Sequence, residues 1–238
     1  RGVYGHEAGA MLPGALVAMA ICLGSGRRDW YRRSVIAGLA GAVGWAWGGQ
    51  ISNMEHRLYI MSTTLVDAVY GFACIGFLGA LWSGIGGATL ALALTHSRRK
   101  LNRFIGPLAV QGTALAAGSL FLFFFPEQRR EYFSFTAEYL HDSSWLPITL
   151  TLVALIPYWL IRKSDRPASG LMILCAAAWW IGYLTLTKFG GLELAPPHRS
   201  ESWSGVLGIL AVLILYHIRN QDRAALMLTQ YAMLAGCI

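Results

Sequence analysis

Apolar stretches long enough to cross a membrane recur along this chain, and short polar loops separate them. The hydrocarbon core of a bilayer is about 30 Å thick and needs about 20 helical residues, and only helices or closed barrels satisfy their backbone hydrogen bonds there. Seven stretches are complete and an eighth runs to the chain end: Gly9–Gly24, Ser34–Ile51, Leu65–Thr95, Phe104–Phe125, Leu146–Ile161, Gly170–Thr187, Trp203–Ile218 and Ala224–Ile238. The pattern predicts an all-α, polytopic transmembrane helical bundle of seven complete spans plus a partial eighth.

The composition agrees with a membrane protein. Hydrophobic residues make up 55% of the chain and charged residues only 13%, with a mean hydropathy of +0.49, far from the charged share of a soluble domain. The longest polar loop is Pro126–Trp145, so residues 1–238 are expected to form a single integral membrane domain. Because the chain starts without Met and ends inside an apolar stretch, we expect it to be a fragment of a longer one.

Lysine and arginine divide unequally between alternate loops. Of 19 in all, 13 lie within Arg27–Arg33, Arg98–Arg103, Arg162–Arg166 and Arg219–Arg223. The positive-inside rule places these loops in the cytoplasm and the N-terminus on the extracytoplasmic side. We therefore expect a multi-pass protein of the cell membrane with membrane lipid as a partner. The pI of about 9.5 then reflects topology and contact with anionic lipid, and no nucleic acid is implied.

Three polar clusters flank span ends on the predicted outer side: His6-Glu7, Asn53–Arg57 and His198–Glu201. The first and third precede inward-running helices, whose N-terminal N–H groups and dipoles favour anions. One site is expected there, with His6 and Glu55 as catalytic residues and a substrate-binding set of Asn53, Arg57, His198, Arg199 and Glu201. The alternative is that these residues are solvated loop ends and helix caps.

A shared site makes a spatial prediction. His6 and Glu55 must lie within about 12 Å of each other, the reach of one bridging substrate group. The pocket should open toward the outer leaflet and be lined by Trp45 or Trp47, whose rings suit the interfacial region of a lipid.

Neither a metal nor a cofactor is predicted. The sequence has no HExxH, Walker or Rossmann motif, and Cys22, Cys74, Cys175 and Cys237 lie in apolar stretches as small packing residues. The segment Thr64–Asp67 matches a capping box, so Asp67 is expected to cap a helix locally rather than to act in a site.

One segment resembles a known family. Gly49-Gln50-Ile51-Ser52-Asn53-Met54-Glu55 is similar to the Gly-Asn-Phe-x-Asn-x-Glu signature of prolipoprotein diacylglyceryl transferases, and Gly5-His6 resembles the family's upstream His-Gly-Gly segment. The family's Arg before the signature falls at Trp47 here, so Arg57 would have to supply the anion contact. The resemblance covers about residues 6–57 and implies a transferase acting on a lipid or lipid-linked substrate at the extracytoplasmic face.

Two other functional classes stay open. Glycine-rich helices and Pro157 within a span are typical of a transporter or channel-like protein, and glycine-rich faces also suit helix association in a non-catalytic membrane subunit. The long stretch Leu65–Thr95 bears on this choice, because its 31 residues would extend about 46 Å. It is expected either to tilt as one helix or to break at Ser83–Gly87. A further short helix, residues 127–141, is expected to lie on the outer membrane surface.

Overall fold

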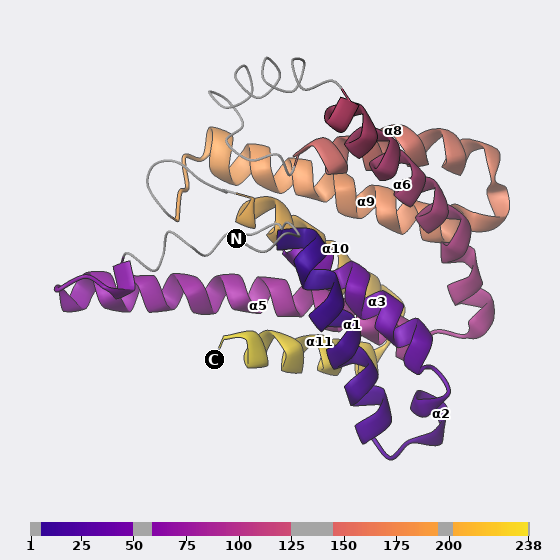
Figure 1. Cartoon of the computed structure of the whole chain (residues 1–238), viewed down its shortest axis with the longest axis horizontal. Helices are drawn as coiled ribbons and strands as arrows, with labels where there is room; N and C mark the ends of the chain where they lie inside the picture. Colours follow the sequence, from indigo (N-terminus) through magenta and orange to yellow (C-terminus); the bar gives the residue numbers. More distant parts are fainter. Residues whose placement is uncertain (1–5, 50–58, 125–144, 195–201, 238) are drawn as a thin grey trace.

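A computed structural model describes residues 6–49, 59–124, 145–194 and 202–237 (Figure 1). Its helices are α1 (His6–Gly24), α2 (Arg28–Tyr31), α3 (Ser34–Gly48), α5 (Leu65–Thr95), α6 (Arg98–Phe124), α8 (Trp145–Ile161), η1 (Lys163–Asp165), α9 (Arg166–Gly182), the π-helix η2 (Tyr183–Phe189), α10 (Trp203–Arg219) and α11 (Arg223–Gly236). No strand occurs in these described ranges, so the predicted all-α class is confirmed there.

The predicted apolar stretches coincide with helices. Stretch and helix share both bounds at Leu65–Thr95 and share their first residue at Ser34 and Trp203. Helix α6 begins earlier than predicted, because its basic first turns, Arg98–Arg103, are helical too. Arginine and lysine are good helix formers, so charge alone does not end a helix.

The long stretch Leu65–Thr95 is one continuous helix, and the expected alternative of a break at Ser83–Gly87 is wrong. The predicted capping box is confirmed at its start. The Thr64 hydroxyl accepts a hydrogen bond from the Asp67 amide at 3.3 Å and donates one to the Asp67 carboxylate at 2.6 Å. Glycines 84, 86 and 87 are buried within the helix, where a neighbouring helix covers the backbone that they expose.

Glycines set the spacing between the helices of one half of the molecule. Helices α1 and α3 meet at Gly14 and Gly41, whose carbonyls lie where the other residue's Cβ would be. Helix α3 meets α5 at Gly44, and α5 meets α11 where Gly79 faces Gly236. The glycine spacings in the sequence therefore serve close packing between helices of this chain, where dispersion and weak Cα–H contacts hold backbones together.

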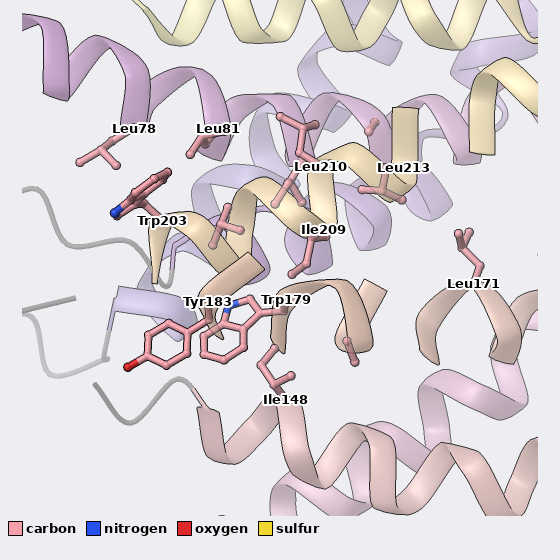
Figure 2. Close-up of a cluster of buried hydrophobic side chains, with 14 of the residues drawn as sticks. Leu78, Leu81, Ile148, Leu171, Trp179, Tyr183, Trp203, Ile209, Leu210 and Leu213 are labelled. Carbon is pink, nitrogen blue, oxygen red and sulfur yellow. The ribbon is translucent and has the colours of Figure 1, made fainter. Parts of the chain in front are cut away.

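A second packing centre is aromatic and aliphatic. Figure 2 shows Trp179 and Tyr183 lying side by side between Ile148 and Ile209. The Trp179 and Tyr183 rings are stacked, with centroids 5.2 Å apart and planes 11° apart, and Trp179 is 1% exposed. Trp203 and Leu210 of α10 extend the cluster toward α5. Offset stacking adds about 0.5–1.5 kcal/mol to the burial of two such rings.

The four arginine-rich segments lie at one end of the bundle (Figure 1). The Arg33 guanidinium donates hydrogen bonds to the carbonyls of Ala93, Leu94 and His96, at 3.1, 2.9 and 2.7 Å. His96 in turn is hydrogen-bonded to Tyr216 at 2.9 Å, so the first, second and fourth segments meet. The third segment joins them at α6, where Asp165 lies close enough to Arg103 for electrostatic attraction. Within the described residues, the arginine-rich segments of the sequence thus gather on one side of the helices.

Two described helical segments are long and apolar enough to cross a membrane by length and composition, Leu65–Thr95 and Lys163–Phe189. Four further apolar helices are shorter: Gly9–Gly24, Ser34–Gly48, Leu146–Ile161 and Trp203–Arg219. Large apolar side chains face outward on several helices, as at Leu12, Val35 and Val66, which are 68%, 80% and 79% exposed. Apolar surface of this extent is typical of a lipid or protein contact.

Candidate functional site

The predicted outer site lies almost wholly outside the described residues. His6 is the first residue of α1, but its side chain is not described. Asn53, Glu55, Arg57, His198, Arg199 and Glu201 lie outside the described ranges, as does the expected surface helix 127–141. The convergence of His6 with Glu55 therefore stays a prediction, and the site that the structure does describe is a different one.

That site is an apolar cavity of about 170 Å³ between α3, α5, α6, α9 and α10. Its wall consists mainly of aliphatic and aromatic side chains, with Trp47 at one end. A pocket toward the outer leaflet was expected to be lined by Trp45 or Trp47. Trp47 lines this cavity, whereas Trp45 packs against Trp82, with ring centroids 5.9 Å apart. A tryptophan in this wall adds a large apolar surface to the cavity.

The two polar side chains in the wall are Thr89 and Gln111, and both are hydrogen-bonded within the protein. The Thr89 hydroxyl bonds to the carbonyls of Ile85 and Gly86 on its own helix, each at 3.0 Å. The Gln111 amide donates to the Thr151 hydroxyl on α8 at 3.0 Å. Because nearly all of the other wall residues are aliphatic or aromatic, the cavity presents mostly a hydrocarbon surface, which selects an apolar ligand over a hydrated one.

The cavity lies mainly in the arginine-rich half of the bundle, although its wall follows α3 from Ile36 to Trp47. Its wall includes Leu92 and Ala93 at the end of α5 and Leu101 and Phe104 near the start of α6. Ala93 is also one of the residues whose carbonyl binds the Arg33 guanidinium, at 3.1 Å. A cation therefore borders the apolar wall directly.

A polar cleft lies at the same end, between the α5–α6 and α10–α11 connections, and is lined by Thr95, His96, Ser97, Lys100, Asn220, Gln221, Asp222, Arg223 and Ala224. The buried His96 ring bonds to Tyr216 through Nε2 and to Thr95 through Nδ1, at 2.9 and 3.3 Å. The Asp222 carboxylate caps α11 by accepting from the Ala225 amide at 3.0 Å. The bond between His96 and Tyr216 fastens the end of α5 to α10.

The electrostatics of the cleft keep His96 neutral and Asp222 ionised. Burial lowers the pKa of His96, and the nearby Lys100 and His217 lower it further, against an opposing effect of Asp222. Burial alone would raise the pKa of Asp222, but hydrogen bonds from Thr95 and the Ala225 amide, with His217 and His96 nearby, lower it overall. A neutral His96 can donate one of its two hydrogen bonds and accept the other, with the roles set by its tautomer.

Acidification is expected to destabilise this end of the bundle through His96. Its folded-state pKa is below the unfolded value of about 6.5, so its contribution is complete above that value and is lost as the pH falls through the folded pKa. Thermal unfolding in detergent at pH 7.5 and pH 5 measures the loss. His96→Gln keeps an amide near Tyr216 but cannot titrate. The melting temperature of this variant should therefore fall less between pH 7.5 and pH 5 than that of the wild-type protein. Equal falls in both proteins would contradict the assignment.

Comparison of the chain with family models, with curated proteins and with solved structures finds no match. The class is therefore defined by the fold and the cavity. It is an all-helical protein whose described residues include two apolar segments of membrane-crossing length, with a hydrocarbon-lined cavity between helices. The cavity could not be found from sequence, because its wall comes from five helices and resembles ordinary apolar packing in each.

Proposed function

We propose that this chain is a multi-pass protein of the cell membrane that acts on a lipid or lipid-linked substrate. The observation that carries the proposal is the cavity among α3, α5, α6, α9 and α10, whose wall is mainly apolar. The gathering of arginine-rich segments at one end of the bundle supports a membrane orientation with that end in the cytoplasm.

The reaction that we propose is a group transfer at the extracytoplasmic face. It rests on the outer polar residues and on the resemblance of Gly49–Glu55 to prolipoprotein diacylglyceryl transferases. In this proposal His6 is the general base, Asn53 and Glu55 orient the substrate, and Arg57 contacts its anionic group.

Transport is the weaker reading. It drew on a break in the long span at Gly84–Gly87, and α5 is continuous through those residues. Carriers commonly bind their substrates at discontinuous helices, and α5 has no unwound backbone at Gly84–Gly87.

The membrane orientation is tested by labelling single cysteines introduced into a variant that lacks the 4 native ones. Cysteines at Arg28 and Arg99 should react with an impermeant maleimide only after the membrane is permeabilised. A cysteine at Met61, which is 81% exposed, should react in intact cells. Labelling of position 28 or 99 from outside would overturn the orientation.

The transferase is tested in membranes that contain the protein and acyl-labelled phospholipids, with products separated by chromatography. His6→Ala should lower product formation at least about 100-fold, the usual scale for loss of a general base. Glu55→Ala should also lower product formation, because the substrate would lose a group that orients it. Met61→Ala is the matched control on the outer side. If both variants are stable and form product at the wild-type rate, the proposed site is wrong.

A further inference from the structure

We propose that the cavity among α3, α5, α6, α9 and α10 binds an acyl chain of an anionic phospholipid from the cytoplasmic leaflet, with the phosphate at the arginines of its rim. The inference rests on the proposed membrane location, and it names a lipid and a leaflet that the outer site does not require. Four steps carry it: the wall, the opening, the size and the charge.

The wall excludes a polar ligand. Thr89 donates to the carbonyls of Ile85 and Gly86, and the Gln111 amide donates one hydrogen bond to Thr151, so the wall offers a guest little beyond the remaining capacity of that amide. A hydrated ligand would lose most of its own hydrogen bonds on entry without replacement, at a cost of about 1–3 kcal/mol for each polar group left unpaired. A hydrocarbon chain has none to lose.

The cavity opens sideways between α3 and α6. Leu39 of α3 and Ile105 of α6 both belong to its wall, and yet they are 55% and 64% exposed. In a bilayer these two side chains would contact lipid directly. An acyl chain can therefore enter from the membrane through this opening without passing through water.

The size fits part of a chain. A cavity of about 150 Å³ holds a benzene ring, so the 170 Å³ here accommodates about six carbons. The rest of the chain would follow the open groove past Leu39 and Ile105. A rigid multi-ring ligand would not fit the enclosed part without moving a helix.

The rim is cationic. Arg98 precedes Leu101 of the wall by one turn of α6, which puts both on the same face of that helix. The Arg33 guanidinium contacts the carbonyl of Ala93, another wall residue, and Arg99 and Lys100 follow in the first turn of α6. Each such residue near a membrane attracts an anionic lipid by about 1 kcal/mol. The combination of a hydrocarbon wall and a basic rim favours an anionic headgroup over a zwitterionic one.

The test uses the full chain in nanodiscs with a photoreactive acyl chain on phosphatidylglycerol, and the same chain on phosphatidylcholine. Crosslinks from the first probe should map to α3, α6 and α9 and should be lost on adding unlabelled phosphatidylglycerol but not phosphatidylcholine. This competition uses the wild-type protein only, so it does not depend on a variant's folding. Equal competition by both lipids, or the absence of saturable crosslinking, would overturn the proposal.

Two variants separate the chain from the headgroup. Ala40→Phe fills the cavity and should weaken crosslinking by both probes about tenfold, whereas Ala109→Phe, on an exposed position of α6 outside the wall, should not. Arg98→Gln should lower the preference for phosphatidylglycerol about fivefold, and Arg28→Gln serves as its control. Unchanged crosslinking in Ala40→Phe contradicts the chain site, and an unchanged preference in Arg98→Gln contradicts the rim.

The outcome is distinguishable from failure of the proposed function. If the cysteine labelling places the arginine-rich end outside, the leaflet assignment and the membrane orientation fail together. If the orientation holds and crosslinking does not saturate, the lipid site fails alone. The transferase assay reports on His6 and Glu55, whereas the crosslinking reports on described wall residues of α3, α6 and α9.

Discussion

Replacing Gly41 by leucine is expected to force α1 away from α3 and to destabilise the protein by about 3 kcal/mol or more. A Cβ at this position would lie 2.6 Å from the Ala18 Cβ and closer still to the Gly14 carbonyl oxygen. The nearest atoms belong to the backbone and to a methyl group, so no flexible side chain can move aside. Thermal unfolding in detergent should show a large fall in melting temperature.

Gly112→Leu is the matched control for this substitution. Gly112 also lies within a long helix, α6, but nothing lies within 4 Å of where its Cβ would be. The variant should unfold within a few degrees of wild type, and leucine's higher helix propensity favours it by up to about 1 kcal/mol. Equal effects at the two positions would contradict the close α1–α3 packing.

Replacing Arg33 by methionine is expected to loosen the arginine-rich end and to cost about 2–3 kcal/mol. The side chain's terminal nitrogen donates to the carbonyls of Ala93, Leu94 and His96 at 3.1, 2.9 and 2.7 Å. These carbonyls lie at the C-terminal end of α5, where no further turn supplies amide donors and where the helix dipole favours a cation. Methionine keeps an unbranched side chain like the aliphatic part of arginine but leaves the three carbonyls without this donor.

Arg32→Met is the control for the charge itself, because Arg32 is exposed and neighbours Arg33. Its melting temperature should stay close to wild type. Arg33→Lys should fall between the two, since lysine supplies the charge and a donor nitrogen, but on a shorter side chain than the one that reaches the three carbonyls. Hydrogen exchange at the end of α5 should increase in Arg33→Met only. A uniform loss of stability in both methionine variants would attribute the effect to net charge.

Local features of the fold were predictable because they depend on neighbours in sequence. The capping box at Thr64–Asp67 is confirmed, since its four residues carry both of the groups that bond. The bounds of α5 followed from the apolar run between that box and His96. Cys237 was predicted less well, because it was expected to pack and is exposed, near the end of α11. An apolar run at a chain end does not reveal whether another helix covers it.

The candidate site was predictable only in kind. Trp47 was expected to line a pocket suited to lipid, and it does line an apolar cavity, but that cavity lies mainly in the arginine-rich half. The predicted outer residues, from His6 to Glu201, are not tested by the described residues. The cavity could not be predicted from any one stretch of sequence. Its wall residues Leu39 and Ile105 are apolar in the same way as residues that are buried in helix packing.

The positions of the helices and of the basic segments between them could be predicted from sequence, because hydrophobic runs, caps and charges act over one or two turns. Tertiary structure decided which glycines meet, as Gly14 meets Gly41, and which arginine caps a distant helix, as Arg33 caps α5. It also decided where packing stops short and leaves a cavity. Those outcomes depend on side-chain shape across several helices at once, and close packing makes each one contingent on all the others.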